Sequence, residues 1–331
     1  MTKSAIFGDR EERIQYVYSN GRKEQVAKLT DLYPHRVSKE NFTDHVTNLQ
    51  DLEVIFSTWG MPVLKSEHLD QLPNLKIVLY SAGSVQKFAR TFLEHGIHVC
   101  SAWRANSIPV SEYTLAQILL ANKGYYRNTR DCQTPEGRRN KPFKGRGNFG
   151  ATVALLGAGA IGQKVIELLQ PFHLNIIVFD PFLSDETASE LGVQKVSLKD
   201  AFRQGDVVSN HLANNPQTVG MIHGAHFSCL QDHATFINTG RGATVVEPDL
   251  IAELQKRPTL TALLDVTSPE PPDPDSPFYT LPNLTLTSHI AGSLNDEVNR
   301  MADYMIEEFQ RWQAGEPLQH EVTPDTLDIM A

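Results

Sequence analysis

The stretch VALLGAGAIGQKVIELL, residues 153–169, decides the fold of the region around it. Apolar residues 153–156 predict a short strand, and the apolar spacing after the glycines predicts a helix. Between them stand Gly157, Gly159 and Gly162, in the pattern G-x-G-x-x-G. This pattern at a strand-to-helix turn indicates a dinucleotide site. Gly157 permits the tight turn, Gly159 lets a pyrophosphate approach the backbone, and Gly162 lets the helix pack on the strand.

The helix that starts at this turn directs its first backbone amides, those of Ala160 and Ile161, toward bound phosphates. The next predicted strand, NIIVFD, ends at Asp180, 18 positions after Gly162. Its carboxylate can accept hydrogen bonds from both ribose hydroxyls of an adenosine and would repel a 2′-phosphate. Residues 181–186 include no arginine, so the pattern favours NAD over NADP. The alternative is a glycine-rich turn beside an unrelated surface aspartate.

The composition of the chain limits its class. Its 331 residues predict two domains, because single cores rarely grow beyond about 250–300 residues. A formal charge of −9 argues against nonspecific binding to nucleic acid or to an anionic membrane surface. No apolar run approaches the ~18 residues that span a bilayer, and the amino terminus lacks the apolar core of a signal peptide. The three cysteines, Cys100, Cys132 and Cys229, lack metal-ligand spacing, which predicts reduced thiols in a cytoplasmic protein without a metal site.

Apolar, β-branched segments alternate with helical patterns along the chain, which predicts parallel sheets with crossover helices. The predicted strands are 4–7, 52–57, 75–81, 98–102, 151–157, 175–180, 206–212, 234–240, 260–266 and 284–289. The predicted helices are 21–33, 66–74, 110–130 and 294–315. Pro109 is expected in the first turn of the third helix. Residues 131–150 are polar, basic and rich in glycine and proline, and they predict an irregular arm that is either a solvated surface or a subunit contact.

Three polar residues follow predicted strands of the second half: Arg241 in FINTGRG, Glu270 in LLDVTSPEPP and His289 in LTSHIAG. Ligands of open parallel sheets bind beside the carboxyl ends of the strands. A histidine transfers protons near neutral pH, and a glutamate beside it stabilises the imidazolium. An arginine can hold a carboxylate and polarise a neighbouring carbonyl. Together with the glycine turn, the three residues indicate hydride transfer to a 2-oxo acid.

Each of the three residues also has a structural interpretation. His289 can be a hydrogen-bonded residue of the fold, Glu270 a surface residue among prolines, and Arg241 the partner of a structural carboxylate. The guanidinium of Arg241 is charged at any physiological pH, so its place between two glycines requires an anion. That anion belongs either to the protein or to a ligand.

Five segments appear in a characteristic order: GATVALLGAGAIG, VFDPF, FINTGRG, LLDVTSPEPP and SHIAG. The segments ANSIPVSEYTLAQIL and GEPLQHEVT accompany them. In these segments the chain resembles the NAD-dependent D-isomer-specific 2-hydroxyacid dehydrogenase family. The resemblance is strong from Asn106 to Gly292 and looser before Asn106.

The resemblance implies a role for each polar residue of the constellation. Arg241 would bind the substrate carboxylate and carbonyl, His289 would be the acid/base, and Glu270 would tune the histidine. Asp265 would hold the nicotinamide amide.

Further residues would complete the two pockets. Thr239 and Gly292, together with Arg241, would line the cofactor pocket. The loop SAGSV stands where backbone amides cradle the substrate carboxylate in the family, here those of Ala82 and Gly83.

The resemblance also implies an α/β architecture of two doubly wound parallel-sheet domains. A Rossmann NAD-binding domain, residues 104–293, would be inserted into a flavodoxin-like substrate-binding domain made of 1–103 and 294–331. The family is commonly dimeric through the long helix and arm of the inserted domain, which implies a homodimer. The expected partner is a small 2-hydroxy or 2-oxo acid, with no nucleic acid and no membrane.

The substrate is poorly specified by the sequence. Ser84, Val85 and Gln86 stand where the family usually has a GVD-like sequence, and Ala213 stands where it often has proline. Candidates for the substrate pocket are Trp59, Met61, Trp103 and Arg104, with packing or surface placement as the alternative for each. A second class of function stays open, because some relatives are NAD-sensing transcriptional corepressors that keep the Arg/Glu/His set. Consumption of NADH with a panel of 2-oxo acids would discriminate the two classes.

Overall fold

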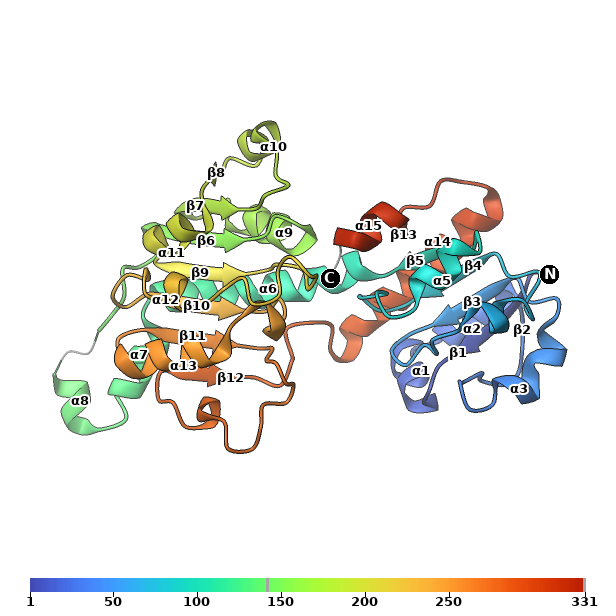
Figure 1. The fold of residues 1–331 in the computed structure, drawn as a ribbon, viewed down its shortest axis with the longest axis horizontal. Coiled ribbons are helices and arrows are strands. Elements are labelled where there is room, and N and C mark those ends of the chain that lie inside the picture. The colour runs from blue at the N-terminus through green and yellow to red at the C-terminus, as the bar shows by residue number, and fades with distance from the viewer. Residues whose placement is uncertain (141–142, 330–331) are drawn as a thin grey trace. The chain divides into compact units, whose positions relative to one another are not determined.

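Figure 1 shows the fold of the chain as a computed structural model, which describes residues 1–140 and 143–329. The chain divides into two compact units. Unit 1 comprises Met1–Asn106 and Ser293–Ala331, and unit 2 comprises Ser107–Gly292. Each unit contains one sheet with an apolar cluster on either face.

Unit 1 contains a six-stranded sheet of order β13-β5-β4-β3-β1-β2. Its strands are β1 (Lys3–Phe7), β2 (Asp31–Leu32), β3 (Val54–Ser57), β4 (Ile77–Tyr80), β5 (His98–Ser101) and β13 (Glu321–Val322). All pairs are parallel except that of β13 with β5. Neighbouring residues of one strand enter different apolar clusters, Ile55 on one face and Val54 on the other. The strands therefore consist of nearly continuous apolar runs, as parallel sheets that are covered on both faces require.

The helices of unit 1 are α1 (Glu11–Val17), α2 (Arg22–Leu29), α3 (Phe42–His45), α4 (Ser66–Leu69), α5 (Ala89–Glu94), α14 (Val298–Ala314) and α15 (Pro324–Ile329). Helix α14 is the amphipathic helix that the sequence predicts near the end of the chain. It buries Met301, Met305 and Phe309 in one apolar cluster of the sheet, because three- and four-residue spacing places these side chains on one face. Gly315, with φ of +71°, ends the helix in the left-handed conformation.

Unit 2 contains a seven-stranded, fully parallel sheet of order β12-β11-β10-β9-β6-β7-β8. Its strands are β6 (Phe149–Leu156), β7 (His173–Phe179), β8 (Gln194–Lys195), β9 (Val207–Asn210), β10 (Thr235–Asn238), β11 (Thr261–Leu264) and β12 (Leu284–Leu286). The chain builds outward from β6 to β8 and then from β9 to β12, so the strand order reverses between β6 and β9. This is the doubly wound order of a Rossmann sheet. The predicted fold class is confirmed.

The helices of the second half begin with α6 (Trp103–Asn122), which runs across the boundary between the units in the sequence. The others are α7 (Tyr125–Asp131), α8 (Pro135–Arg139), α9 (Ala160–Leu169), α10 (Asp185–Glu190), α11 (Leu198–Gln204), α12 (Gly224–Phe227) and α13 (Glu247–Lys256). Within the described part of the chain, no helix is both long and apolar enough to cross a membrane.

Some local predictions differ from the structure. Helix α6 starts at Trp103, so Pro109 lies inside it and not in its first turn. Ala105 is fully buried in an apolar cluster, and this packing stabilises the helical turn that precedes Pro109. The predicted irregular arm, 131–150, contains the short helix α8, and its residues 141–142 lie outside the described residues. Strands β2, β8 and β13 were not predicted, because each has only two residues and no apolar run.

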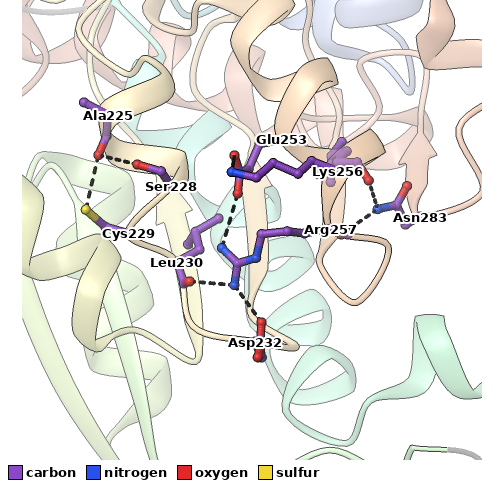
Figure 2. Close-up of polar contacts among 10 residues, drawn as sticks. Ala225, Ser228, Cys229, Leu230, Asp232, Glu253, Lys256, Arg257 and Asn283 are labelled. Carbon is purple, nitrogen blue, oxygen red and sulfur yellow. Dashed lines mark hydrogen bonds and ion pairs between the residues drawn. The ribbon is translucent and has the colours of Figure 1, made fainter.

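Arg257 links several loops at the amino edge of the unit 2 sheet, as Figure 2 shows. Its Nη2 donates to the Leu230 carbonyl at 2.8 Å and lies 2.9 Å from Asp232 Oδ1. Its Nη1 lies 3.4 Å from Glu253 Oε1, and its carbonyl accepts a hydrogen bond from the Asn283 amide at 3.5 Å. The segments that precede β10, β11 and β12 are therefore tied together at the edge opposite the carboxyl ends of the strands.

All three tryptophans, Trp59, Trp103 and Trp312, belong to unit 1. Trp59 packs against both apolar clusters of that unit, and the ring of Trp312 lies 6.1 Å from that of Phe309. Unit 2 has none, so any tryptophan fluorescence of the protein originates in unit 1.

Candidate active site

The glycine turn joins β6 to α9 in unit 2. Gly157 has φ of +97°, and a Cβ there would lie 3.0 Å from the His211 carbonyl oxygen. A Cβ on Gly162 would overlap the Gly157 carbonyl. Around Gly159, by contrast, the described residues place no non-neighbouring atom within 4 Å of a Cβ. The turn thus has the tight bend, the open approach and the close helix packing that fit the pyrophosphate of a dinucleotide.

Asp180 follows β7 and is bonded to the glycine turn. Its Oδ2 accepts a hydrogen bond from the Ala158 amide at 2.6 Å, and its Oδ1 accepts one from the Phe182 amide at 2.7 Å. The first amides of α9, those of Ala160 and Ile161, belong to the same turn and point from the positive end of the helix. The structure thus brings a carboxylate and a helix amino terminus together, one suited to ribose hydroxyls and the other to phosphate.

Arg241 lies in the loop after β10, and its backbone is held firmly. Its carbonyl accepts hydrogen bonds from Thr244 Oγ1 at 2.8 Å and from the Asn238 amide at 3.3 Å. Its Nη1 donates to the Gly240 carbonyl at 2.8 Å. Burial lowers the pKa of the guanidinium below its usual value, and the Glu270 carboxylate opposes that shift. Among the described side chains, those of residues 1–140 and 143–327, no carboxylate forms an ion pair with Arg241.

Glu270 and His289 meet beside the carboxyl ends of the neighbouring strands β11 and β12. The distance from Glu270 Oε1 to His289 Nδ1 is 2.6 Å, and Glu270 Oε2 accepts a long hydrogen bond, 3.4 Å, from the Thr267 amide. The side chains of His289 and Glu270 are 49% and 40% exposed, so the pair is accessible to a ligand. Because Glu270 holds Nδ1, the opposite ring nitrogen, Nε2, is the atom that can exchange a proton with that ligand.

Asp265 fixes the loop that carries His289. Its Oδ1 accepts hydrogen bonds from the Ile290 amide at 2.8 Å and from Thr287 Oγ1 at 2.6 Å. Its Oδ2 accepts one from the Ala291 amide at 2.9 Å. The carboxylate is almost fully buried and well satisfied. Its role toward a nicotinamide amide stays a prediction.

Thr239 lies next to a histidine that the structure keeps neutral. Its Oγ1 is 3.4 Å from His211 Nδ1 and 3.3 Å from Thr114 Oγ1. The other ring nitrogen, Nε2, is 3.0 Å from Ser209 Oγ. Burial lowers the pKa of His211 to about 4. The imidazole beside Thr239 is therefore uncharged near neutral pH. Gly292, the other predicted lining residue, is the last residue of unit 2.

The low pKa of His211 predicts a pH dependence of stability. The unfolded chain takes up this proton below the ordinary value of 6.5, whereas the folded chain does so only below about 4. The free energy of unfolding should therefore decrease as the pH falls from 6.5 to 4, by at most about 3 kcal/mol. His211→Gln should reduce that decrease. Amide exchange of β9 and β10 measures it within unit 2, and an equal pH dependence in both proteins would contradict the prediction.

The predicted carboxylate cradle lies in unit 1. The Ala82 amide donates to the Tyr80 carbonyl at 2.8 Å, so it already has a partner. Ser101 Oγ donates to the carbonyls of Ala82 and Gly83 at 3.0 and 2.5 Å. The role of this loop stays a prediction. Of the other pocket candidates, Met61 and Trp59 pack against an apolar cluster, and the Arg104 guanidinium lies 4.9 Å from the Trp103 ring centroid.

Comparison with known proteins decides the family. The family described as "D-isomer specific 2-hydroxyacid dehydrogenase, NAD binding domain" matches residues 115–291, more than half of the chain. The chain belongs to this dehydrogenase family. The matched segment lies within unit 2 and includes the glycine turn, Asp180, Arg241, Glu270 and His289. Unit 2 is therefore the NAD-binding domain of a D-2-hydroxyacid dehydrogenase family member.

Individual relatives support this assignment. A D-3-phosphoglycerate dehydrogenase of Archaeoglobus fulgidus is 26% identical over 96% of this chain and 58% of its own length. A putative 2-hydroxyacid dehydrogenase of Bacillus subtilis is 33% identical over 53% of this chain and 51% of its own length. The chain thus spans about half the length of these relatives. The crystal structure of a phosphoglycerate oxidoreductase from Rhizobium etli, 22% identical, shares the fold with a TM-score of 0.80 over 99% of this chain and 100% of that one.

Some residues that hold the candidate site together are not predicted from the sequence. Glu247 accepts a hydrogen bond from the Ser268 amide at 2.7 Å, next to the Glu270 loop. The Tyr113 hydroxyl lies 3.2 Å from Thr287 Oγ1, which in turn binds Asp265. These contacts join positions far apart in the sequence, and no spacing rule indicates them.

Proposed function

We propose that this family member is an NAD-dependent oxidoreductase that transfers a hydride between NAD(H) and a small D-2-hydroxy acid or its 2-oxo acid. The observation that carries the proposal is the 2.6 Å pair of His289 Nδ1 and Glu270 Oε1. The same unit carries the glycine turn and Arg241, a cation without an ion-paired carboxylate in the described part of the chain. A proton donor, an anion-binding group and a nucleotide turn are the parts that reduction of a 2-oxo acid needs.

When bound, NAD supplies the hydride donor or acceptor. In reduction, protonated His289 donates a proton from Nε2 to the carbonyl oxygen of the substrate. Glu270 holds Nδ1, which stabilises the imidazolium and orients the ring. Arg241 binds the substrate carboxylate and stabilises negative charge on the carbonyl oxygen. In oxidation, neutral His289 takes the hydroxyl proton of the 2-hydroxy acid.

The residues that would hold NAD are Gly157, Gly159, Ala160, Ile161, Gly162, Asp180, Thr239, Arg241, Asp265 and Gly292. Asp180 supports NAD as the preferred cofactor, because its carboxylate would repel the 2′-phosphate of NADP. The ratio of kcat/KM for NADH to that for NADPH measures this preference.

The direct test is the consumption of NADH with a panel of 2-oxo acids: glyoxylate, hydroxypyruvate, pyruvate, and branched and aromatic members. Turnover of at least one of them is expected. No turnover with any would contradict the proposed activity and would direct attention to a protein-binding role for the same scaffold.

Glu270→Gln should shift the pH profile of 2-oxo acid reduction toward acid. The neutral amide can still bond the histidine ring, but it no longer stabilises the charge of the imidazolium. The dependence of kcat/KM on pH measures the shift, and an unchanged profile would remove Glu270 from its proposed role.

We also propose that the protein is a homodimer through unit 2. Leu120 on α6, Tyr125 on α7 and Phe149 on β6 are 39%, 47% and 79% exposed, although all three are large and apolar. Such exposed side chains are suited to a subunit contact. Sedimentation of the protein and of a Leu120→Glu variant tests this, since dimers of the first and monomers of the second are expected.

A further inference from the structure

The loop of residues 267–271 carries Glu270 to His289, and its own position must therefore be fixed. Thr267 Oγ1 donates to the Pro269 carbonyl at 2.8 Å, and the Thr267 amide lies 3.4 Å from Glu270 Oε2. Both bonds lie within the loop, so they set its shape but do not attach it to the rest of unit 2.

One attachment of the loop is steric and lies on the Arg241 side. A Cβ on Gly242 would overlap the backbone of Thr267. The backbones of the arginine loop and the glutamate loop therefore press against each other. This contact excludes side chains but supplies no directional bond.

A directional attachment of the loop backbone comes from Glu247, the first residue of α13. Its Oε1 accepts a hydrogen bond from the Ser268 amide at 2.7 Å. Ser268 stands two residues before Glu270, and Glu247 stands six residues after Arg241. One short carboxylate bond thus connects the segment after the anion-binding residue to the segment that holds the proton-transfer pair.

We infer that Glu247 is a positioning residue, whose carboxylate anchors the Ser268 amide and thereby holds Glu270 against His289. The inference rests on the proposed function for its effect on turnover. A half-buried acceptor at a helix amino terminus makes a strong, directional bond to a backbone amide. Burial raises the pKa of Glu247 to about 7, and the Ser268 bond opposes this. A half-buried carboxylate, whose charged form is destabilised by burial, is more typical of a functional site than of the protein surface.

The same turn of α13 provides a matched control. Asp249 Oδ2 accepts a hydrogen bond from the Gly224 amide at 2.7 Å. Glu247→Ala and Asp249→Ala therefore each remove one carboxylate from the first turn and one bond to a backbone amide. Only the first releases the loop of Glu270. Glu247→Gln keeps an acceptor oxygen without the charge, and Glu247→Leu keeps the bulk without an acceptor if the alanine variant does not fold.

Two structural readouts do not depend on turnover. Exchange of the Ser268 amide should accelerate about tenfold in Glu247→Ala, the equivalent of one lost hydrogen bond. The downfield proton resonance of His289 Nδ1, bonded to Glu270, should weaken in the same variant. Glu247→Gln and Asp249→Ala should keep the Ser268 exchange rate and the His289 Nδ1 resonance of the wild-type protein.

The kinetic readout separates positioning from general damage. In Glu247→Ala, kcat for 2-oxo acid reduction should fall about tenfold with little change in KM for NADH, and Glu247→Gln should recover most of it. Unchanged Ser268 exchange in Glu247→Ala, or equal losses of kcat in Glu247→Ala and Asp249→Ala, would overturn the inference. If the wild-type protein reduces no 2-oxo acid, the proposed function fails, and the two structural readouts still decide the role of Glu247.

Discussion

Arg241→Ala should reduce kcat/KM for the 2-oxo acid about a thousandfold, the equivalent of about 4 kcal/mol of transition-state stabilisation. The guanidinium is partly buried in a loop whose backbone is bonded to Thr244 and Asn238. The described residues give it no carboxylate as an ion-pair partner. Its charge is therefore available to the carboxylate and the carbonyl oxygen of the substrate. The measurement is steady-state reduction with the best acid of the panel.

Arg241→Lys is the matched control for this loss. Lysine keeps the charge but not the planar fork that binds a carboxylate through two parallel bonds. For Arg241→Lys, kcat/KM for the 2-oxo acid should lie between the values of the wild-type protein and of Arg241→Ala. The Kd for NADH should change much less than kcat/KM for the acid in either variant, because Arg241 would line the cofactor pocket with other residues but would hold the substrate carboxylate itself. Weaker NADH binding with an unchanged kcat/KM for the 2-oxo acid would show that Arg241 binds the cofactor and not the substrate.

His289→Asn should lower kcat about a thousandfold, within the range that general acid–base catalysis contributes. Asparagine removes the proton donor while its amide can still bond Glu270. The loop itself should stay in place, because Asp265 binds the Ile290 and Ala291 amides without help from the imidazole. NADH binding is therefore expected to persist, which a fluorescence titration of bound NADH can verify.

A second substitution tests whether the histidine and the glutamate act as one unit. Glu270→Gln should cost activity in the wild-type background but almost nothing in His289→Asn, since residues of one catalytic unit are not additive. Additive losses in the double variant would mean that Glu270 acts on the substrate by another route. A His289→Asn protein with more than about a tenth of wild-type kcat would contradict the assignment of the proton donor.

Much of the fold follows from local sequence patterns. Short apolar runs become β3, β4, β9, β10 and β11. They are predicted as strands because parallel strands are buried on both faces and are therefore apolar throughout. The glycine turn is also local, since its three glycines act within one strand-to-helix connection. Glu270 and His289 each follow a strand, and parallel pairing of β11 with β12 brings them together.

Other features depend on contacts that no short window contains. The bond of Glu247 to Ser268 spans 21 positions, and it exists because α13 starts beside the end of β11. The partners of Asp265 lie 22 to 26 positions away. The position of Pro109 inside α6 results from burial of the residues before it, which outweighs the preference of proline for a first turn. Two-residue strands such as β8 carry too few apolar residues for a pattern.

The distribution of tryptophan gives this protein intrinsic donors for fluorescence energy transfer between its two units. Trp59, Trp103 and Trp312 all belong to unit 1, while the glycine turn belongs to unit 2. Tryptophan emission overlaps the absorption of reduced nicotinamide, so any energy transfer to NADH bound at that turn must pass from one unit to the other. Its efficiency at saturating NADH reports the separation of the units without an added dye.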